Sequence, residues 1–178
     1  MSKAIHTRFI EIAGDLSPEL AEEIASSEPL QLVPCQDVPF PERLCRAIAG
    51  QQLSIKAAET IWGRVVGSAS SKSLMDHFSA VEPTVLRTCG LSAAKVKAVR
   101  AVAQTACTGQ LDAEELRGLD HRDRTQRLTA IWGVGQWTAD MMGIFYFGDP
   151  DIWPEGDVTA RKTLEKLTSS RRKTICTA

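Results

Sequence analysis

The sequence lacks the patterns that mark membrane proteins, secreted disulfide scaffolds and small metal-binding domains. No apolar run approaches the roughly eighteen residues of a membrane span, and no apolar signal-like segment follows the start Met1-Ser-Lys-Ala-Ile. No two of the five cysteines lie within four residues of each other, so a Cys-x-x-Cys metal knuckle is excluded. We therefore expect a cytoplasmic, nucleoid-associated protein (nuclear in a eukaryote) with reduced, partly buried thiols.

An excess of positive charge is also missing. The formal net charge is −1, which weighs against a protein that binds nucleic acid by electrostatics alone. Contact with nucleic acid would have to use backbone N–H donors and local basic groups, which gather near the end of the chain. These basic residues are Arg161, Lys162, Lys166, Arg171, Arg172 and Lys173. The isolated His6, His77 and His121 stand among polar residues, which favours surface or capping roles over metal ligation.

Alternating apolar patterns of the kind that mark β-strands are nearly absent, whereas helical spacing runs through most of the chain. The sequence therefore predicts an all-α fold. The expected N-caps and first-turn residues are Ser17, Pro41, Ser54, Ser92, Asp112 and Asp120. The residues expected on the buried face of the helix after Ser54 are Ile55, Ala58, Ile61, Trp62 and Val65. The aromatic run Phe145-Tyr-Phe147 is expected in the core.

Two links rich in proline and glycine divide the chain. The first carries three prolines within residues 34–41, and the second spans residues 148–156. We expect two helical lobes with a cleft between them. The first lobe should span about 38–147, and the second should combine about 1–37 with 148–178.

A Gly-Val-Gly hairpin within residues 128–142 separates two helical segments. Gly133 and Gly135 allow backbone conformations that other residues disfavour, so one helix should end after Ile131 and the next begin near Gln136. Unbonded N–H groups there form a positive concavity that binds a phosphate oxygen without Lys or Arg. The residues expected at the phosphate are Gly133, Val134, Gly135, Gln136 and Thr138. An ordinary packed helix corner explains the two glycines equally well.

Three sequence blocks, taken together, are far more specific than the glycines alone. They are Ala47-Ile-Ala-Gly-Gln51-Gln52-Leu53-Ser54, then Leu86-Arg-Thr-Cys-Gly90-Leu91-Ser92-Ala-Ala-Lys95, then Leu128-Thr-Ala-Ile-Trp-Gly133-Val-Gly135-Gln-Trp-Thr138-Ala-Asp-Met-Met142 with Trp153-Pro-Glu-Gly-Asp157. In this order they resemble the helix-hairpin-helix DNA glycosylase superfamily, most closely its 3-methyladenine DNA glycosylase II type. The resemblance covers roughly Phe40–Leu167. It implies a glycosylase fold and, as partner, double-stranded DNA with a damaged base, bound by a monomer.

Asp157 occupies the position of the catalytic aspartate of that family. Cleavage of an N-glycosidic bond builds positive charge on the sugar, and a nearby carboxylate stabilises it and activates water. An aspartate at a helix start is more often only an N-cap, and Asp157 precedes an expected helix over Val158–Leu167. The resemblance makes catalysis the better interpretation, and the two roles are compatible.

The resemblance also shows that two groups found in other superfamily members are missing here, a Schiff-base lysine and the ligands of an iron–sulfur cluster. Superfamily members that form a Schiff base with the sugar carry a Lys two residues past the second hairpin glycine, where this chain has Trp137. The cysteine ligands of the iron–sulfur cluster of another branch are absent. We therefore expect a monofunctional enzyme with no required cofactor. Its hairpin can hold a structural Na⁺ or K⁺ at the carbonyls of Thr129, Trp132 and Val134.

Base flipping needs a side chain that fills the gap and a surface that receives the base. By resemblance the wedge is Gln52, with Leu53 the second choice, although two glutamines between helices are otherwise a solvated turn. Trp137 and Trp153 are expected to stack on the base, with Met141 at the edge of the pocket. An indole face attracts an alkylated purine because that base is cationic.

The chain is short where family members continue with helical sequence rich in Arg and aromatics. We expect this to leave the second lobe truncated after its helix at 158–167. Two alternatives to an alkylpurine glycosylase therefore stay open. One is a non-catalytic helix-hairpin-helix DNA-binding protein, and the other is a glycosylase for another lesion such as uracil.

Overall fold

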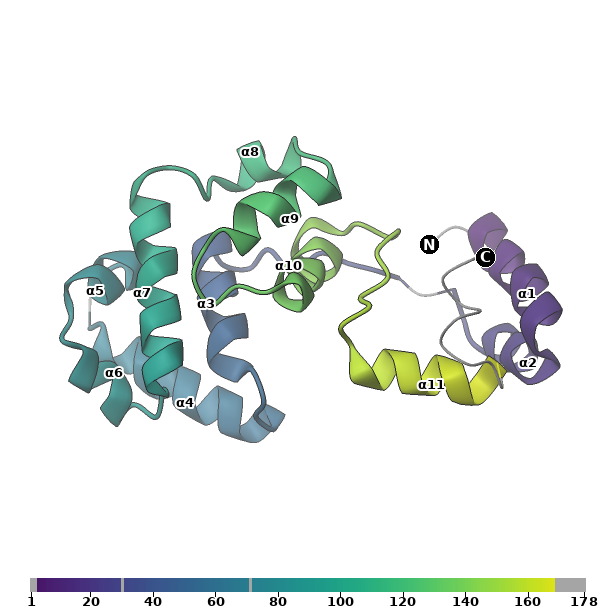
Figure 1. Cartoon of the computed structure of the whole chain (residues 1–178), viewed down its shortest axis with the longest axis horizontal. Helices are drawn as coiled ribbons and strands as arrows, with labels where there is room; N and C mark the ends of the chain where they lie inside the picture. The colour runs from purple at the N-terminus through teal and green to yellow at the C-terminus, as the bar shows by residue number, and fades with distance from the viewer. Residues whose placement is uncertain (1–2, 30, 71, 169–178) are drawn as a thin grey trace. The chain divides into compact units, whose positions relative to one another are not determined.

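The computed structural model describes residues 3–29, 31–70 and 72–168. These residues form helices and no strand, which confirms the predicted all-α class (Figure 1). The elements are α1 (Lys3–Leu16), α2 (Pro18–Ser26), α3 (Phe40–Gly50), α4 (Ile55–Ser68), α5 (Leu74–Ala80), α6 (Pro83–Thr88), α7 (Ala93–Cys107), α8 (Ala113–Arg117), α9 (His121–Thr129), α10 (Gln136–Met142), the π-helix η1 (Gly143–Phe147) and α11 (Val158–Thr168). None of the helices in these ranges is long and apolar enough to cross a membrane.

The chain divides into two compact units. One unit is the continuous stretch Pro34–Asp149, and the other combines Met1–Val33 with Pro150–Ala178. In the second unit α1 packs on α2, and α2 packs on α11. That unit buries few side chains: of its described residues, only Ala13 and Ser17 are classed as buried.

The core of the unit Pro34–Asp149 is built around α7, which packs against α3, α5 and α6 (Figure 1). Val99 and Val102 of α7 are fully buried, as are Leu44 of α3, Phe78 of α5 and Leu86 of α6. Complete burial of such a side chain contributes roughly 2 kcal/mol, so these contacts fix the helices that carry the site.

The predicted helix starts are confirmed at atomic level. Ser54 Oγ accepts from the N–H of Ala57 (3.3 Å), and Asp120 Oδ1 accepts from the N–H of Asp123 (2.8 Å). The side chains of Ser17, Ser92 and Asp112 likewise cap their helices, and Pro41 lies in the first turn of α3. Each such cap contributes about 1 kcal/mol.

Three sequence-based expectations about burial are wrong. Ile55 is 80% exposed, because it is the first residue of α4 and its side chain tilts back toward the exposed turn before the helix. Phe145 is 48% exposed although its neighbour Tyr146 is buried. His77 is buried rather than on the surface. The remaining members of the α4 set lie on the inner face, with Trp62 and Val65 buried.

The cysteines follow the expected pattern of free thiols with mixed burial. Cys45 and Cys89 are buried, Cys35 is half-buried and Cys107 is exposed. Burial raises the pKa of the Cys45 thiol, so this thiol is inert at neutral pH. The fifth cysteine, Cys176, lies outside the described residues.

The buried imidazole of His77 predicts a pH dependence of stability. Burial, with a smaller effect of Lys72, lowers the pKa of His77 in the folded protein, and its Nε2 lies 3.0 Å from Ser68 Oγ. The stability that this group contributes is therefore complete above its unfolded pKa of about 6.5 and is lost as pH falls toward the lower folded pKa. Urea unfolding of His77→Gln between about pH 5 and pH 8 should show a flatter pH dependence than the wild type. Parallel pH profiles of the two proteins would contradict this assignment.

Candidate nucleic-acid interface

The hairpin joins α9 to α10 by a tight turn over residues 130–135. Helix α9 ends at Thr129, two residues before the predicted end, and α10 begins at Gln136 as predicted. In the turn the N–H of Val134 donates to the carbonyl of Ile131 (3.1 Å). Val134 and Ile131 are 5% and 6% exposed, so apolar burial anchors both ends of the turn.

The two hairpin glycines serve different purposes. Gly133 has φ +88°, and a Cβ there would lie 2.5 Å from the Cβ of Ala98 on α7, so only glycine fits. Gly135 has φ −97° and ψ 171°, which other residues adopt readily, so the expected need for backbone freedom is wrong at this position. A Cβ on Gly135 would meet no atom within 4 Å, and the space beside it is open to an approaching ligand.

The first turn of α10 carries no side-chain cap. Its N-cap is Gly135, which has no side chain to accept from the N–H groups of that turn. Such a turn presents donors and the positive end of a short helix dipole to an anion. The arrangement fits the expected phosphate contact, with the backbone as donor.

The side chain of Thr138 faces inward, so the expected contact of this residue with a phosphate stays a prediction for its backbone N–H. Thr138 is 2% exposed, and its Oγ1 accepts from the side-chain amide of Gln51 (3.0 Å). The hydroxyl therefore ties α10 to the turn after α3, and its side chain is unavailable to DNA.

The turn at residues 51–54 is held from behind and exposed at its tip. The ammonium of Lys95 donates to the carbonyls of Ala49 (2.8 Å) and Gln51 (2.7 Å), and burial lowers the pKa of Lys95. Gln52 is exposed with φ +58°, and Leu53 is 39% exposed. Both expected wedge residues therefore project from a braced loop.

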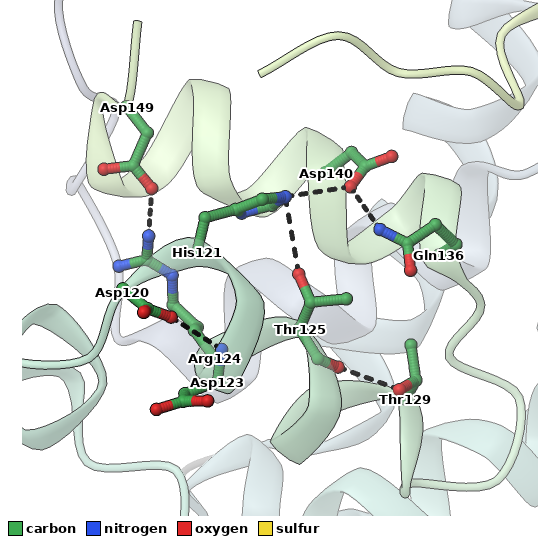
Figure 2. Close-up of polar contacts among 9 residues, drawn as sticks. All are labelled: Asp120, His121, Asp123, Arg124, Thr125, Thr129, Gln136, Asp140 and Asp149. Carbon is green, nitrogen blue, oxygen red and sulfur yellow. Dashed lines mark hydrogen bonds and ion pairs between the residues drawn. The ribbon is translucent and has the colours of Figure 1, made fainter. Parts of the chain in front are cut away.

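A buried polar network joins the two helices that flank the hairpin (Figure 2). Asp140 on α10 is 3% exposed, and its Oδ1 accepts from the Gln136 side-chain amide (2.7 Å). His121 Nε2 of α9 lies 3.2 Å from the same oxygen and 3.5 Å from Thr125 Oγ1. The sequence reasoning missed this network, although the i, i+4 spacing of Gln136 and Asp140 was a signal for it.

A second polar contact lies beyond the network, also in Figure 2. Arg124 is 3% exposed, forms an ion pair with Asp149 and donates through Nη1 to the carbonyl of Leu116 (3.2 Å). Its guanidinium lies 4.2 Å from the centre of the Phe147 ring. These contacts tie α9 to the end of the π-helix that continues α10.

Asp157 caps α11, as one of its two interpretations required. Its Oδ1 accepts from the N–H groups of Thr159 and Ala160, both at 2.9 Å, and its own N–H donates to the carbonyl of Pro154 (2.8 Å). The carboxylate is therefore fixed at the positive end of an eleven-residue helix, which stabilises its negative charge.

The aromatic residues expected at the base are accessible. Trp153, four residues before Asp157, is 48% exposed and belongs to the same unit. Trp137 is 38% exposed and Met141 is half-buried, and both belong to the unit of the hairpin.

The basic residues expected to help bind nucleic acid fall partly on α11. Arg161, Lys162 and Lys166 lie on that helix, and Arg161 Nε is 3.8 Å from the carboxylate of Glu165. The remaining three, Arg171, Arg172 and Lys173, lie outside the described residues.

The backbone carbonyls expected at a monovalent cation suit such a ligand. No backbone N–H of the described turn residues donates to the carbonyls of Thr129, Trp132 or Val134. Carbonyl oxygens are the hard ligands that alkali cations use, so the chemistry of these three groups is compatible with the expected ion, which stays a prediction.

Comparison with known proteins agrees with the all-helical fold. No family model matches the chain. The crystal structure of a DNA-3-methyladenine glycosidase from Bacillus halodurans is 34% identical, with a TM-score of 0.73, over 91% of this chain and 73% of that one. The 3-methyladenine DNA glycosylase of Schizosaccharomyces pombe, solved in complex with abasic DNA, is 26% identical with a TM-score of 0.73, over 92% of this chain and 82% of that one.

The fold and the hairpin define a helix-hairpin-helix protein of the DNA glycosylase type. Within that class the chain belongs to the 3-methyladenine DNA glycosylase family. A curated relative, DNA-3-methyladenine glycosylase 1 of Schizosaccharomyces pombe, is 29% identical over 157 residues, which are 86% of this chain. The match spans 63% of the length of that relative.

The different purposes of the two glycines predict different costs of substitution. Gly133→Ala should lower the free energy of unfolding by about 2 kcal/mol or more, because the new Cβ overlaps Ala98 at a positive φ. Gly135→Ala, the matched control, should change it by less than about 0.5 kcal/mol, since its backbone and surroundings accept a methyl group. Denaturant unfolding measures both. Equal losses in the two variants would show that Gly133 does not pack on α7 as described.

Proposed function

We propose that this protein is a monofunctional DNA glycosylase that excises alkylated purines of the 3-methyladenine type and so initiates base excision repair. The observation that carries the proposal is the carboxylate of Asp157, which two backbone N–H groups at the start of α11 hold in place. The same chain has the hairpin of the family. The family membership supports the substrate class, since the similar proteins are named as 3-methyladenine glycosylases.

In the proposed reaction the bond from the sugar to the base breaks with its electron pair going to the base. The sugar becomes a cation, which the carboxylate of Asp157 stabilises. A water oxygen then bonds to the same sugar carbon, and Asp157 accepts its proton. A purine nucleotide of the 3-methyladenine type is already positively charged and its base leaves neutral, so one carboxylate is sufficient for its release.

Trp137 underlies the proposed absence of lyase activity. Schiff-base chemistry needs an amine at the sugar, and an indole nitrogen is no nucleophile of that kind. Water is then the nucleophile, and the product is an abasic site. The Schizosaccharomyces pombe structure contains abasic DNA, which is the kind of product that this route leaves.

Base flipping is assigned to the exposed turn and the indoles. Gln52 is the proposed wedge, because it is exposed on a loop whose carbonyls at Ala49 and Gln51 accept from Lys95. Leu53 is the alternative tip. Trp137 and Trp153 are the proposed stacking surfaces for the cationic base, with Met141 beside them.

DNA binding is assigned to the backbone of the hairpin and of the first turn of α10, from Gly133 to Thr138, acting on a phosphate of a double-stranded substrate. A Na⁺ or K⁺ at the carbonyls of Thr129, Trp132 and Val134 would add positive charge beside that phosphate. The backbone donors explain how a chain of net charge −1 binds a polyanion.

The test separates the two roles of Asp157. Asparagine caps helices as well as aspartate does, so Asp157→Asn should keep the stability of α11 while removing the charge. We expect the variant to release base from methylated or 1,N6-ethenoadenine duplexes at least about 100-fold more slowly than the wild type. Asp112→Asn, which changes the cap of α8 in the same way, is the matched control and should keep full activity.

Two outcomes would overturn parts of the proposal. Equal base release by the wild type and Asp157→Asn would remove the catalytic role of Asp157. Binding of lesion-containing DNA without release of any base would identify a non-catalytic binding protein, and release of uracil alone would identify another lesion class.

A further inference from the structure

A hollow of about 450 Å³ lies beside the hairpin, between the hairpin and the helices α6 and α7. It is lined by Pro83, Lys97, Arg100, Ala101, Gln104 and Trp132. Both charged residues in this lining are cations. On a chain of net charge −1, such a hollow is a place where positive charge gathers.

Lys97 is held over the face of Trp132. Its Nζ lies 4.1 Å from the centre of the indole ring, and Trp132 is 46% exposed. Among the described residues, no carboxylate forms an ion pair with Lys97. The indole therefore orders the side chain without neutralising its charge.

The two other cations on this part of α7 have structural partners. Lys95 donates to two backbone carbonyls of the 49–51 segment. Arg100 donates to the carbonyl of Val81 (2.6 Å) through Nη1. Of these three residues, Lys97 is thus the exposed one whose ammonium no backbone carbonyl holds, while Arg100 adds positive potential to the same hollow.

Close packing places this lysine next to the hairpin. Gly133 touches Ala98, the residue that follows Lys97, and Trp132 precedes Gly133. The pair Lys97 and Trp132 therefore stands at the point where α7 meets the hairpin backbone. If the hairpin binds one phosphate of a DNA strand, the next phosphates of that strand lie close to the hairpin. The ammonium of Lys97 is then well placed to contact one of them.

We propose that Lys97, ordered by the ring of Trp132, binds a backbone phosphate of the DNA strand that the hairpin grips. The proposal rests on the proposed DNA-binding function for the identity of the anion. It adds a second, side-chain contact to the backbone grip of the hairpin, one that depends on salt as an ammonium–phosphate pair does.

The test is the salt dependence of DNA affinity. Binding of a duplex with an abasic-site analogue is measured by fluorescence anisotropy across a series of KCl concentrations. Lys97→Met should reduce the slope of log affinity against log salt by about 0.9, the value for one lost phosphate contact. Lys97→Arg should keep the wild-type slope because it keeps the charge. Trp132→Leu should weaken binding at the wild-type slope, since the charge remains but is no longer ordered.

The matched control is Lys72→Met, which removes another exposed lysine of the same unit, in the segment between α4 and α5. It should leave both the affinity and the slope unchanged. A wild-type slope in Lys97→Met, or an equal loss of slope in Lys72→Met, would overturn the site while the wild type still binds DNA. No binding by the folded wild type would overturn both this site and the proposed function.

Discussion

The buried carboxylate of Asp140 is the constraint on which the candidate interface depends. It lies on α10, one turn after Gln136, and interacts with residues from both sides of the hairpin. Removing a charged group from water is costly unless hydrogen bonds replace the lost hydration. The side-chain amide of Gln136 and the imidazole of His121 supply these hydrogen bonds. Because His121 belongs to α9 and Asp140 to α10, the same contacts hold the two helices together.

The other contacts of the hairpin follow from this arrangement. With α9 and α10 fixed, the turn between them packs against Ala98 of α7. Only glycine fits at position 133, because a Cβ there would overlap the side chain of Ala98. Thr138, in the first turn of α10, accepts a hydrogen bond from the side-chain amide of Gln51, and the backbone carbonyl of Gln51 accepts from Lys95. The hairpin proposed to bind phosphate and the turn proposed to carry the wedge are therefore parts of one connected set of hydrogen bonds within one unit.

The sequence could predict those features that depend on local chemistry. Caps such as Ser54 and Asp120 were identifiable because a short oxygen-bearing side chain before an apolar helix satisfies open N–H groups. The hairpin and the helix start at Gln136 were recognisable from the two glycines that separate two helical segments. The family followed from three blocks in a fixed order.

What depends on tertiary contacts was not predictable. The inward direction of Thr138, the burial of His77 and the pairing of His121 with Asp140 each involve residues distant in sequence. The need for glycine at position 133 comes from Ala98, and nothing local distinguishes Gly133 from Gly135. The predicted burial of Ile55 is wrong because apolar periodicity does not show which turns of a helix extend beyond the core.

We expect the side-chain oxygen Oδ1 of Asp140 to hold the hairpin in the geometry proposed for DNA binding. The most direct measurement compares Asp140→Ala and Asp140→Asn with the wild type in two quantities, the amide hydrogen exchange rate of residues 130–136 and the affinity for DNA. Asparagine keeps an oxygen that accepts from Gln136, so Asp140→Asn should stay near the wild type. Asp140→Ala should exchange faster in this segment and lose DNA affinity while α3 and α7 keep their protection. Wild-type exchange rates and wild-type DNA affinity in Asp140→Ala would show that Asp140 does not hold the hairpin.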